Sequence, residues 1–140
     1  MMQQPYPSFY DLIEESLHLS GIARFKVISN SMFPLIQKGD WVEVKKLTGE
    51  DCFLVGEIVL YRKANEFILH RITHIDQDVV LVKGDHNKLP DPPINKGEVI
   101  GRLKRIQKFN IWLDLGNPTA YFFVCTIGKY LNRKIIFRPN

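Results

Sequence analysis

Three strand-like segments follow one another in GEIVLYRKANEFILHRITHIDQDVVLVKG, residues 56–84. Each segment is rich in Val, Ile, Leu and aromatic side chains, and such compositions are typical of β-strands. The connections KANE and DQD are short and polar, as hairpin loops are. Because consecutive strands joined by tight loops run in opposite directions, this stretch predicts an antiparallel sheet.

Strand-like segments also flank this stretch on both sides. RFKVIS and DWVEVKKL precede it, and EVIGRLKRIQKF and NIWLDL follow it. We therefore predict a mainly β fold, with residues 24–113 forming a small antiparallel sheet or a partly closed barrel. The intervening segment DHNKLPDPPINKGE contains three prolines and predicts a long irregular loop, and loops of this length in compact domains are often functional.

A helix is expected at each end of the chain. Residues 1–23 contain PSFYDLIEESLHLSG, in which Ser8 and Asp11 have the spacing of a capping box and Gly21 is a natural stop. Residues 117–134 predict a second helix. Its apolar run, roughly 12 residues long, is too short to span a bilayer, for which about 20 are needed. We expect this C-terminal helix to pack on the core, with peripheral contact to a membrane as the alternative.

Length and composition limit the classes of function. The 140 residues, 45% of them hydrophobic, fit one domain over residues 1–140. The net charge of +4 permits an anionic partner, but the basic residues are dispersed, so we expect solvated faces and no nucleic-acid partner. Cys52 and Cys125 lie far apart and form no metal-binding pair. No secretory signal or full membrane span is recognisable, which favours a cytoplasmic or peripheral membrane location.

Several polar residues are candidates for chemistry. Ser31, in SNSMFPLIQKGD, needs a neighbouring base to become a nucleophile. His70 lies inside an apolar strand and could be that base, and Asp85 or Asp91 in the proline-rich loop could orient it. Each also has an ordinary structural explanation: a polar turn for the serine, a buried histidine bonded to a carbonyl, and loop residues for the aspartates.

A metal site formed by His70, His74, His86 and an aspartate is a weaker hypothesis. Regular alternation would put His70 and His74 on one strand face, with Cα atoms roughly 13 Å apart. Zinc ligands lie about 2 Å from one ion, so two histidines so placed rarely share it. We expect neither a metal nor a cofactor.

Taken together, the segments resemble the catalytic domain of the signal peptidase I family, in the S24/S26-type group that includes the LexA-type repressor peptidases. SNSMFPLIQKGDWVEV is similar to the Ser-x-Ser-Met-x-Pro box of that family. FILHRIT resembles the box that carries the general base, and VLVKGDHNKLPD resembles the Lys-Gly-Asp box. The histidine followed by arginine is similar to the endoplasmic-reticulum and archaeal subclass, which uses serine, histidine and aspartate.

The resemblance implies a role for each matching residue. Ser31 would be the nucleophile, His70 the base, and Asp91 the carboxylate that orients it. Ser29 would join the Ser31 backbone N–H in an oxyanion hole. Asp85 would give structural support, although which aspartate serves as the triad carboxylate stays open at this point.

The leading hypothesis is a serine endopeptidase that removes a leader or signal segment from a precursor polypeptide. The substrate would bind as an added strand, with small side chains near the scissile bond. The family's N-terminal membrane anchor is not recognisable, so we expect a precursor presented in the cytoplasm or at the inner membrane face. The alternatives are a LexA-like domain that cleaves itself and a non-catalytic module that binds peptide or membrane.

Overall fold

The computed structural model describes residues 8–48, 52–64, 66–115 and 126. One α-helix, α1 (Phe9–Ser20), precedes the strands. The strands and one short 3-10 helix then follow in chain order: β1 (Ile22–Lys26), β2 (Trp41–Lys46), β3 (Ile58–Lys63), β4 (Glu66–Asp76), β5 (Val79–Lys83), β6 (Ile94–Asn95), η1 (Lys96–Glu98), β7 (Val99–Lys108) and β8 (Ile111–Asp114). The mainly β class with an N-terminal helix is confirmed.

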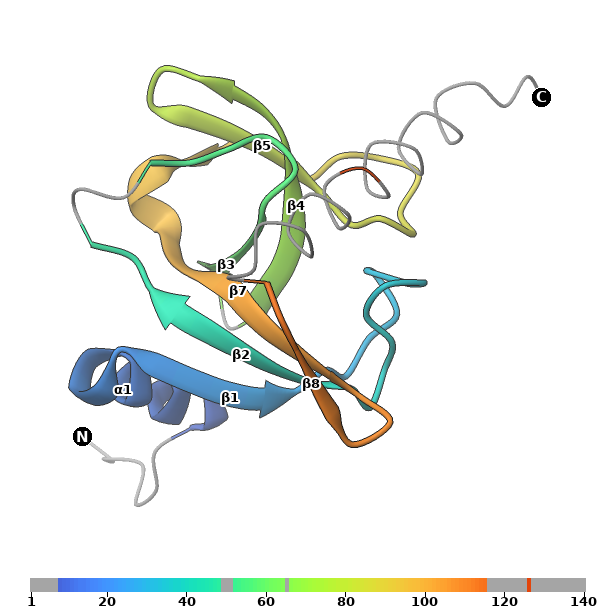
Figure 1. The fold of residues 1–140 in the computed structure, drawn as a ribbon. Coiled ribbons are helices and arrows are strands. Elements are labelled where there is room, and N and C mark those ends of the chain that lie inside the picture. The colour runs from blue at the N-terminus through green and yellow to red at the C-terminus, as the bar shows by residue number, and fades with distance from the viewer. Residues whose placement is uncertain (1–7, 49–51, 65, 116–125, 127–140) are drawn as a thin grey trace.

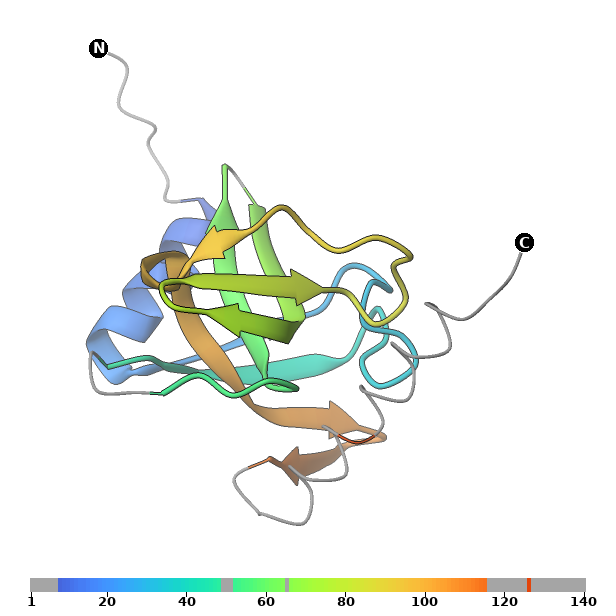
Figure 2. The ribbon, with the colours of Figure 1, turned by 90° about the horizontal axis from the view of Figure 1, so that it is seen from above.

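All the strands belong to one antiparallel sheet in the order β1-β2-β7-β3-β4-β5-β6, and β8 pairs with β7 (Figure 1). The sheet curls strongly, as the perpendicular view shows (Figure 2). Its ends do not pair with each other, so of the two predicted forms it is the antiparallel sheet and not the partly closed barrel. Instead of meeting as paired strands, β1 and the first half of β4 both line one cleft.

Helix α1 begins and ends where its sequence predicts. The Ser8 side chain accepts from the backbone of Asp11, the Asp11 carboxylate accepts from the backbone of Ser8, and both contacts together form a capping box. Gly21 ends the helix in the left-handed region at φ 74°, which glycine adopts without a Cβ clash. Ile13 and Leu17 face inward and are buried, and they place α1 against β1.

The strand alternation is interrupted in β4. β4 pairs with β5 in a register that shifts between Ile72 and His74, which leaves Thr73 as an extra residue, as in a β-bulge. His74 is therefore exposed and does not continue the row of His70 and Ile72, both buried. The expectation that His70 and His74 share one strand face is wrong for this reason.

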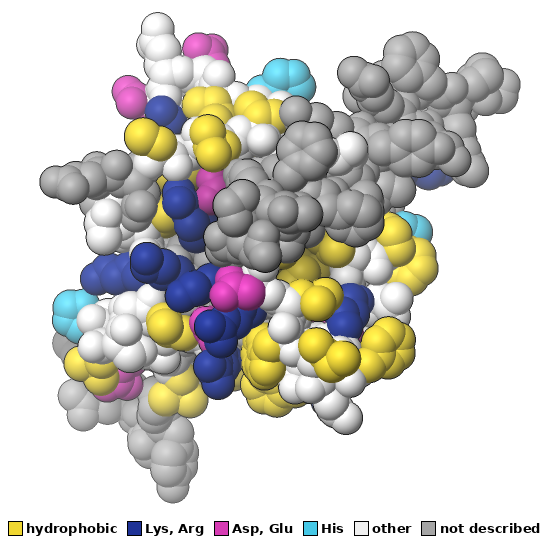
Figure 3. All heavy atoms as spheres, viewed as in Figure 1, with side chains coloured by type: hydrophobic (Ala, Val, Ile, Leu, Met, Phe, Trp, Pro, Cys, Tyr) yellow, Lys and Arg dark blue, Asp and Glu magenta, His cyan; other side chains and the backbone are white. Residues whose placement is uncertain are grey.

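Charged side chains gather in a band across one face of the molecule, with acidic groups among the basic ones (Figure 3). Arg24 pairs with Glu43 at 2.7 Å, and Arg102 pairs with Glu57 at 2.7 Å. The two carboxylates are buried, and basic side chains from neighbouring strands cover them. Part of the positive charge is thus used inside the protein in ion pairs that link strands.

The predicted C-terminal helix at residues 117–134, and any membrane contact it makes, lie outside the described residues. Within the part of the chain that the structure describes, no helix is long and apolar enough to cross a bilayer. The proline-rich segment is irregular as predicted, apart from the two-residue strand β6 and η1.

Ile36 provides a test of how the loop after β1 is anchored. Its side chain is completely buried in the cluster that includes Met32 and Val42. We expect Ile36→Ala to lower the free energy of unfolding by about 2–5 kcal/mol, because it leaves a cavity in the core. Urea unfolding measures this difference. Ile111→Ala, at a position 63% exposed, is the matched control and should change stability by less than about 0.5 kcal/mol. Equal effects of the two substitutions would contradict the anchoring.

Candidate functional site

Ser31 lies in the loop between β1 and β2. Met32 and Ile36, both buried, hold this loop on the core, and the Ile36 N–H donates to the Met32 carbonyl at 3.0 Å. The Asn30 side chain accepts from the Lys38 N–H at 2.8 Å and ties the two limbs of the loop together. The peptide bond between Phe33 and Pro34 is cis. Ser31 is therefore carried by a loop with its own internal bonds and core contacts.

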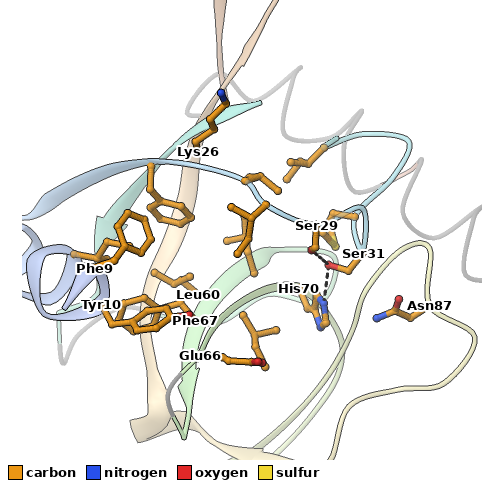
Figure 4. Close-up of a pocket in the computed structure, with 18 residues that line it drawn as sticks. Phe9, Tyr10, Lys26, Ser29, Ser31, Leu60, Glu66, Phe67, His70 and Asn87 are labelled. Atoms are coloured by element: carbon orange, nitrogen blue, oxygen red, sulfur yellow. Dashed lines mark hydrogen bonds between the residues drawn. The ribbon is translucent and has the colours of Figure 1, made fainter. Parts of the chain in front are cut away.

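His70, from the middle of β4, points toward this loop. Its Nε2 lies 3.1 Å from Ser31 Oγ, and its ring is 8% exposed (Figure 4). Its Nδ1 is hydrogen-bonded to Asp91 Oδ2. When Nδ1–H donates to the carboxylate, Nε2 is left as an acceptor for the serine proton. Serine, histidine and aspartate are thus joined in one chain of hydrogen bonds.

Asp91 is held by a second donor that sequence reasoning missed. The Tyr61 hydroxyl, from β3, donates to Asp91 Oδ2 at 2.5 Å. Burial, and next the contact with Asp91, raise the pKa of Tyr61 far above its usual value, so the phenol stays a donor. Burial alone would raise the pKa of Asp91, but the hydrogen bonds from His70 and Tyr61 outweigh it and lower that pKa.

Asp85, the other candidate aspartate, does not contact His70 in this arrangement and instead pairs with Arg71. Arg71 Nε and Nη2 donate to the two carboxylate oxygens at 2.9 and 2.7 Å, and Nη1 donates to the Gly56 carbonyl at 2.7 Å. The side chains of the pair are 1% and 0% exposed. This bidentate contact fixes the start of the proline-rich loop to β4.

The same loop docks directly on the serine loop. The His86 N–H donates to the Ser31 carbonyl at 2.9 Å, and the Asp85 N–H contacts Met32 Sδ at 3.4 Å. Gly84 makes this approach feasible, because a Cβ there would lie 2.7 Å from the Ser31 carbonyl oxygen. Beside it, the Lys83 ammonium donates to the Gly84 carbonyl at 2.9 Å. Burial lowers the pKa of Lys83, and Asp85 and Asp91 partly oppose that effect.

Ser29 also lies at the site. Its Oγ is 3.3 Å from Ser31 Oγ, and its side chain is exposed to the cleft (Figure 4). The structure thus brings together Ser29, Ser31, His70 and Asp91, with Asp85 in the supporting layer.

The remaining histidines of the metal hypothesis lie elsewhere. His74 contacts the Thr73 hydroxyl, and the His86 ring packs edge-on against Phe33. Among the residues that the structure describes, no three His, Cys, Asp or Glu side chains are grouped so that they could hold a metal ion.

A cleft of about 400 Å³ opens beside Ser31 and His70. It runs along the chain segment from Phe25 to Ser29 on one side and along Glu66–His70 on the other (Figure 4). Helix α1 closes its far end with Phe9, Tyr10 and Ile13. The contribution of α1 to the cleft could not be predicted from the sequence, because it depends on how the sheet curls.

A comparison with protein families gives a match over most of the chain. The family model described as Peptidase S24-like covers residues 2–104, more than half of the chain. The chain belongs to the Peptidase S24-like family. This confirms the resemblance to the S24/S26-type serine peptidase group. No curated protein matches the sequence.

The Arg71–Asp85 pair of this S24-like chain predicts a large effect of a single substitution. Arg71→Met leaves the Asp85 carboxylate buried without its partner, and we expect unfolding to become easier by about 3–5 kcal/mol. Denaturant unfolding checks the value. Arg71→Met combined with Asp85→Leu should recover a large part of the loss. If the double variant lost as much stability relative to wild type as Arg71→Met and Asp85→Leu lose together when made singly, the pairing would be contradicted.

The hydrogen bond from Tyr61 to Asp91 in this S24-like chain predicts a stability difference that depends on pH. The Tyr61 hydrogen bond lowers the pKa of Asp91 in the folded state, so its stabilising effect is present above the ordinary aspartate pKa of 3.8 and is lost as pH falls through the lowered value. We therefore expect the stability difference between wild type and Tyr61→Phe to be largest near neutral pH and to shrink in acid.

Unfolding free energies measured from pH 7 down to about pH 2, below the ordinary aspartate pKa, give this difference directly. Tyr10→Phe, on α1 and without a described contact to Asp91, is the matched control. A Tyr61→Phe difference that stays constant over the whole range would show that the phenol acts on stability only through packing.

Proposed function

We propose that the protein is a serine endopeptidase of the signal-peptidase type that removes a leader or signal segment from a precursor polypeptide. One observation carries the proposal: Ser31, His70 and Asp91, from three separate parts of the chain, form one hydrogen-bonded series beside a cleft. Membership in a family described as peptidase-like supports it.

The geometry supports acyl transfer in two steps. Ser31 Oγ attacks the scissile carbonyl while His70 Nε2 accepts its proton, and His70 then gives that proton to the leaving amine. Water, activated by the same imidazole, hydrolyses the acyl-enzyme and releases Ser31. Asp91 keeps Nδ1–H oriented and stabilises the imidazolium that forms in each step. The Ser31 backbone N–H and the Ser29 hydroxyl would stabilise the oxyanion.

The cleft suits an extended polypeptide, because strand edges border it on both sides. The Val27 N–H bonds to the Asp40 carbonyl at 2.8 Å. Antiparallel alternation then turns the backbone groups of Lys26 and Ile28 away from β2, toward the outer edge. β5 pairs with β4 only from Arg71 onward, so Glu66–His70 are paired on the β3 side alone. A substrate strand placed between these edges would gain backbone hydrogen bonds from this chain.

Cleavage of a peptide library tests the proposal without a known substrate. We expect the wild type to cut a proteome-derived peptide mixture at sites with small side chains next to the scissile bond, as identified by mass spectrometry. Ser31→Ala should reduce the rate at least about 10³-fold, because no other described hydroxyl contacts His70.

Ser29→Ala should keep the same cleavage sites but lower the rate by about 10²- to 10³-fold, which is the loss expected for one oxyanion donor. The same cleavage pattern from wild type and Ser31→Ala would overturn the peptidase proposal. Shortening of the purified chain by itself would instead favour a self-cleaving domain.

A further inference from the structure

The far end of the cleft is built from aromatic side chains of α1 and β4. Tyr10 contacts Phe67 edge-to-face, with ring centroids 5.1 Å apart, and Phe9 contacts Tyr10 at 5.9 Å. Between these rings and Ser31 the floor contains Leu60 and Leu69, and Figure 4 shows the aromatic rings at one end and the Ser31–His70 pair at the other. The cleft is thus lined mainly by apolar side chains between its aromatic end and the Ser31–His70 pair, and the charged side chains of Lys26 and Glu66 also border it (Figure 4).

Several contacts hold this wall against the sheet. Ile13, on the same helix, is buried, and the capping box defines the first turn of α1. Glu14 forms an ion pair with Arg62 of β3 at 2.7 Å, and the Arg62 guanidinium lies over the Phe67 ring. These contacts join α1 to the β3–β4 hairpin and link the two sides of the wall.

The space exceeds what small side chains need. A dry apolar cavity of about 150 Å³ holds a benzene ring, and this cleft measures about 400 Å³. Phe9 is still 54% exposed beside it. A peptide with only alanine-sized side chains would leave the aromatic wall uncovered, whereas a large apolar side chain would remove it from water.

We propose that this cleft is a specificity site for a large apolar side chain, Leu, Met or Phe, on the substrate polypeptide, with Phe9 and Tyr10 as the residues that select it. The inference rests on the proposed peptidase function for the identity of the occupant. The substrate would then need small residues next to the scissile bond and, in addition, a large apolar residue farther along its chain.

The position of that residue follows from strand geometry. Three residues separate His70 from Phe67 along β4, which is about 10 Å at the rise of a strand. A substrate strand that runs beside β4 therefore brings a residue two to four positions from the scissile bond to the aromatic wall. Polypeptide is the occupant favoured here because the strand edges at Lys26–Ile28 and Glu66–His70 offer backbone groups along the whole cleft.

Peptide binding to Ser31→Ala tests the inference, since this variant cannot consume the probe. The probes are three fluorescently labelled nonapeptides of alternating Thr and Ala with Lys at both ends, in which the central Ala is kept or replaced by Leu or Phe. Fluorescence anisotropy gives each Kd. We expect the Leu and Phe peptides to bind at least about tenfold more tightly than the all-Ala peptide.

Two variants made in the Ser31→Ala background locate the preference. Phe9→Ala with Tyr10→Ala should reduce it to less than about threefold, and Phe9→Ala alone, at an exposed position, should reduce it in part. Leu19→Ala is the matched control on the same helix, 75% exposed and outside the cleft, and should keep the full preference. Thermal unfolding establishes that each variant is folded.

The outcomes separate this inference from the peptidase proposal. Equal Kd values for the three peptides, or no measurable binding, would overturn the specificity site and leave the cleft to another occupant. A preference that survives in the Phe9 and Tyr10 double variant would also overturn it. If the preference behaves as expected while the wild type cleaves no peptide, the apolar site stands and the peptidase proposal fails.

Discussion

Two adjacent residues of one strand hold the whole site together. His70 and Arg71 follow each other in β4 and point to opposite faces, and each contacts one aspartate of the same loop: Asp91 and Asp85. The buried Arg71–Asp85 pair fixes where the loop begins, and the His70–Asp91 contact fixes where it returns. The loop between the two aspartates in turn donates the His86 N–H to the Ser31 carbonyl, so this double attachment supports the serine in addition to the core contacts of its own loop.

The electrostatics of the site follow from the same arrangement. Two carboxylates are placed in a poorly solvated region, and Arg71, Lys83 and the Tyr61 hydroxyl lie around them. The net effect lowers the pKa of Asp91, so this carboxylate stays ionised and continues to orient the histidine. A hydrogen-bonded acceptor of this kind stabilises a positive imidazolium without accepting its proton.

Local sequence signals predicted the parts of the fold that depend on neighbours in the chain. The cap at Ser8, the stop at Gly21 and the strand segments all follow from short patterns. The Ser31, His70 and Asp91 candidates came from their order in three separate segments, and the structure brings them into contact. Tyr61 could not be assigned, because an apolar strand predicts only that a buried phenol needs some partner and does not name Asp91.

Features that depend on the shape of the whole sheet could not be predicted from the sequence, for a similar reason. The extra residue at Thr73 moved His74 out of the row predicted from regular alternation. The open gap between β1 and β4 and the aromatic wall from α1 depend on the twist accumulated over the sheet. The residues proposed to select the substrate therefore depend on the curvature of the sheet, which local sequence patterns do not predict. The proposed catalytic residues instead lie in short motifs that the sequence shows.

The most direct test is the reaction of the protein with a fluorophosphonate, which phosphonylates activated serines. We predict one adduct, located on Ser31 by mass spectrometry, with a rate constant reduced at least about 100-fold in His70→Ala and clearly reduced in Asp91→Asn. An adduct on another residue, or equal rates for wild type and His70→Ala, would contradict the claim that Ser31, His70 and Asp91 act as one catalytic unit.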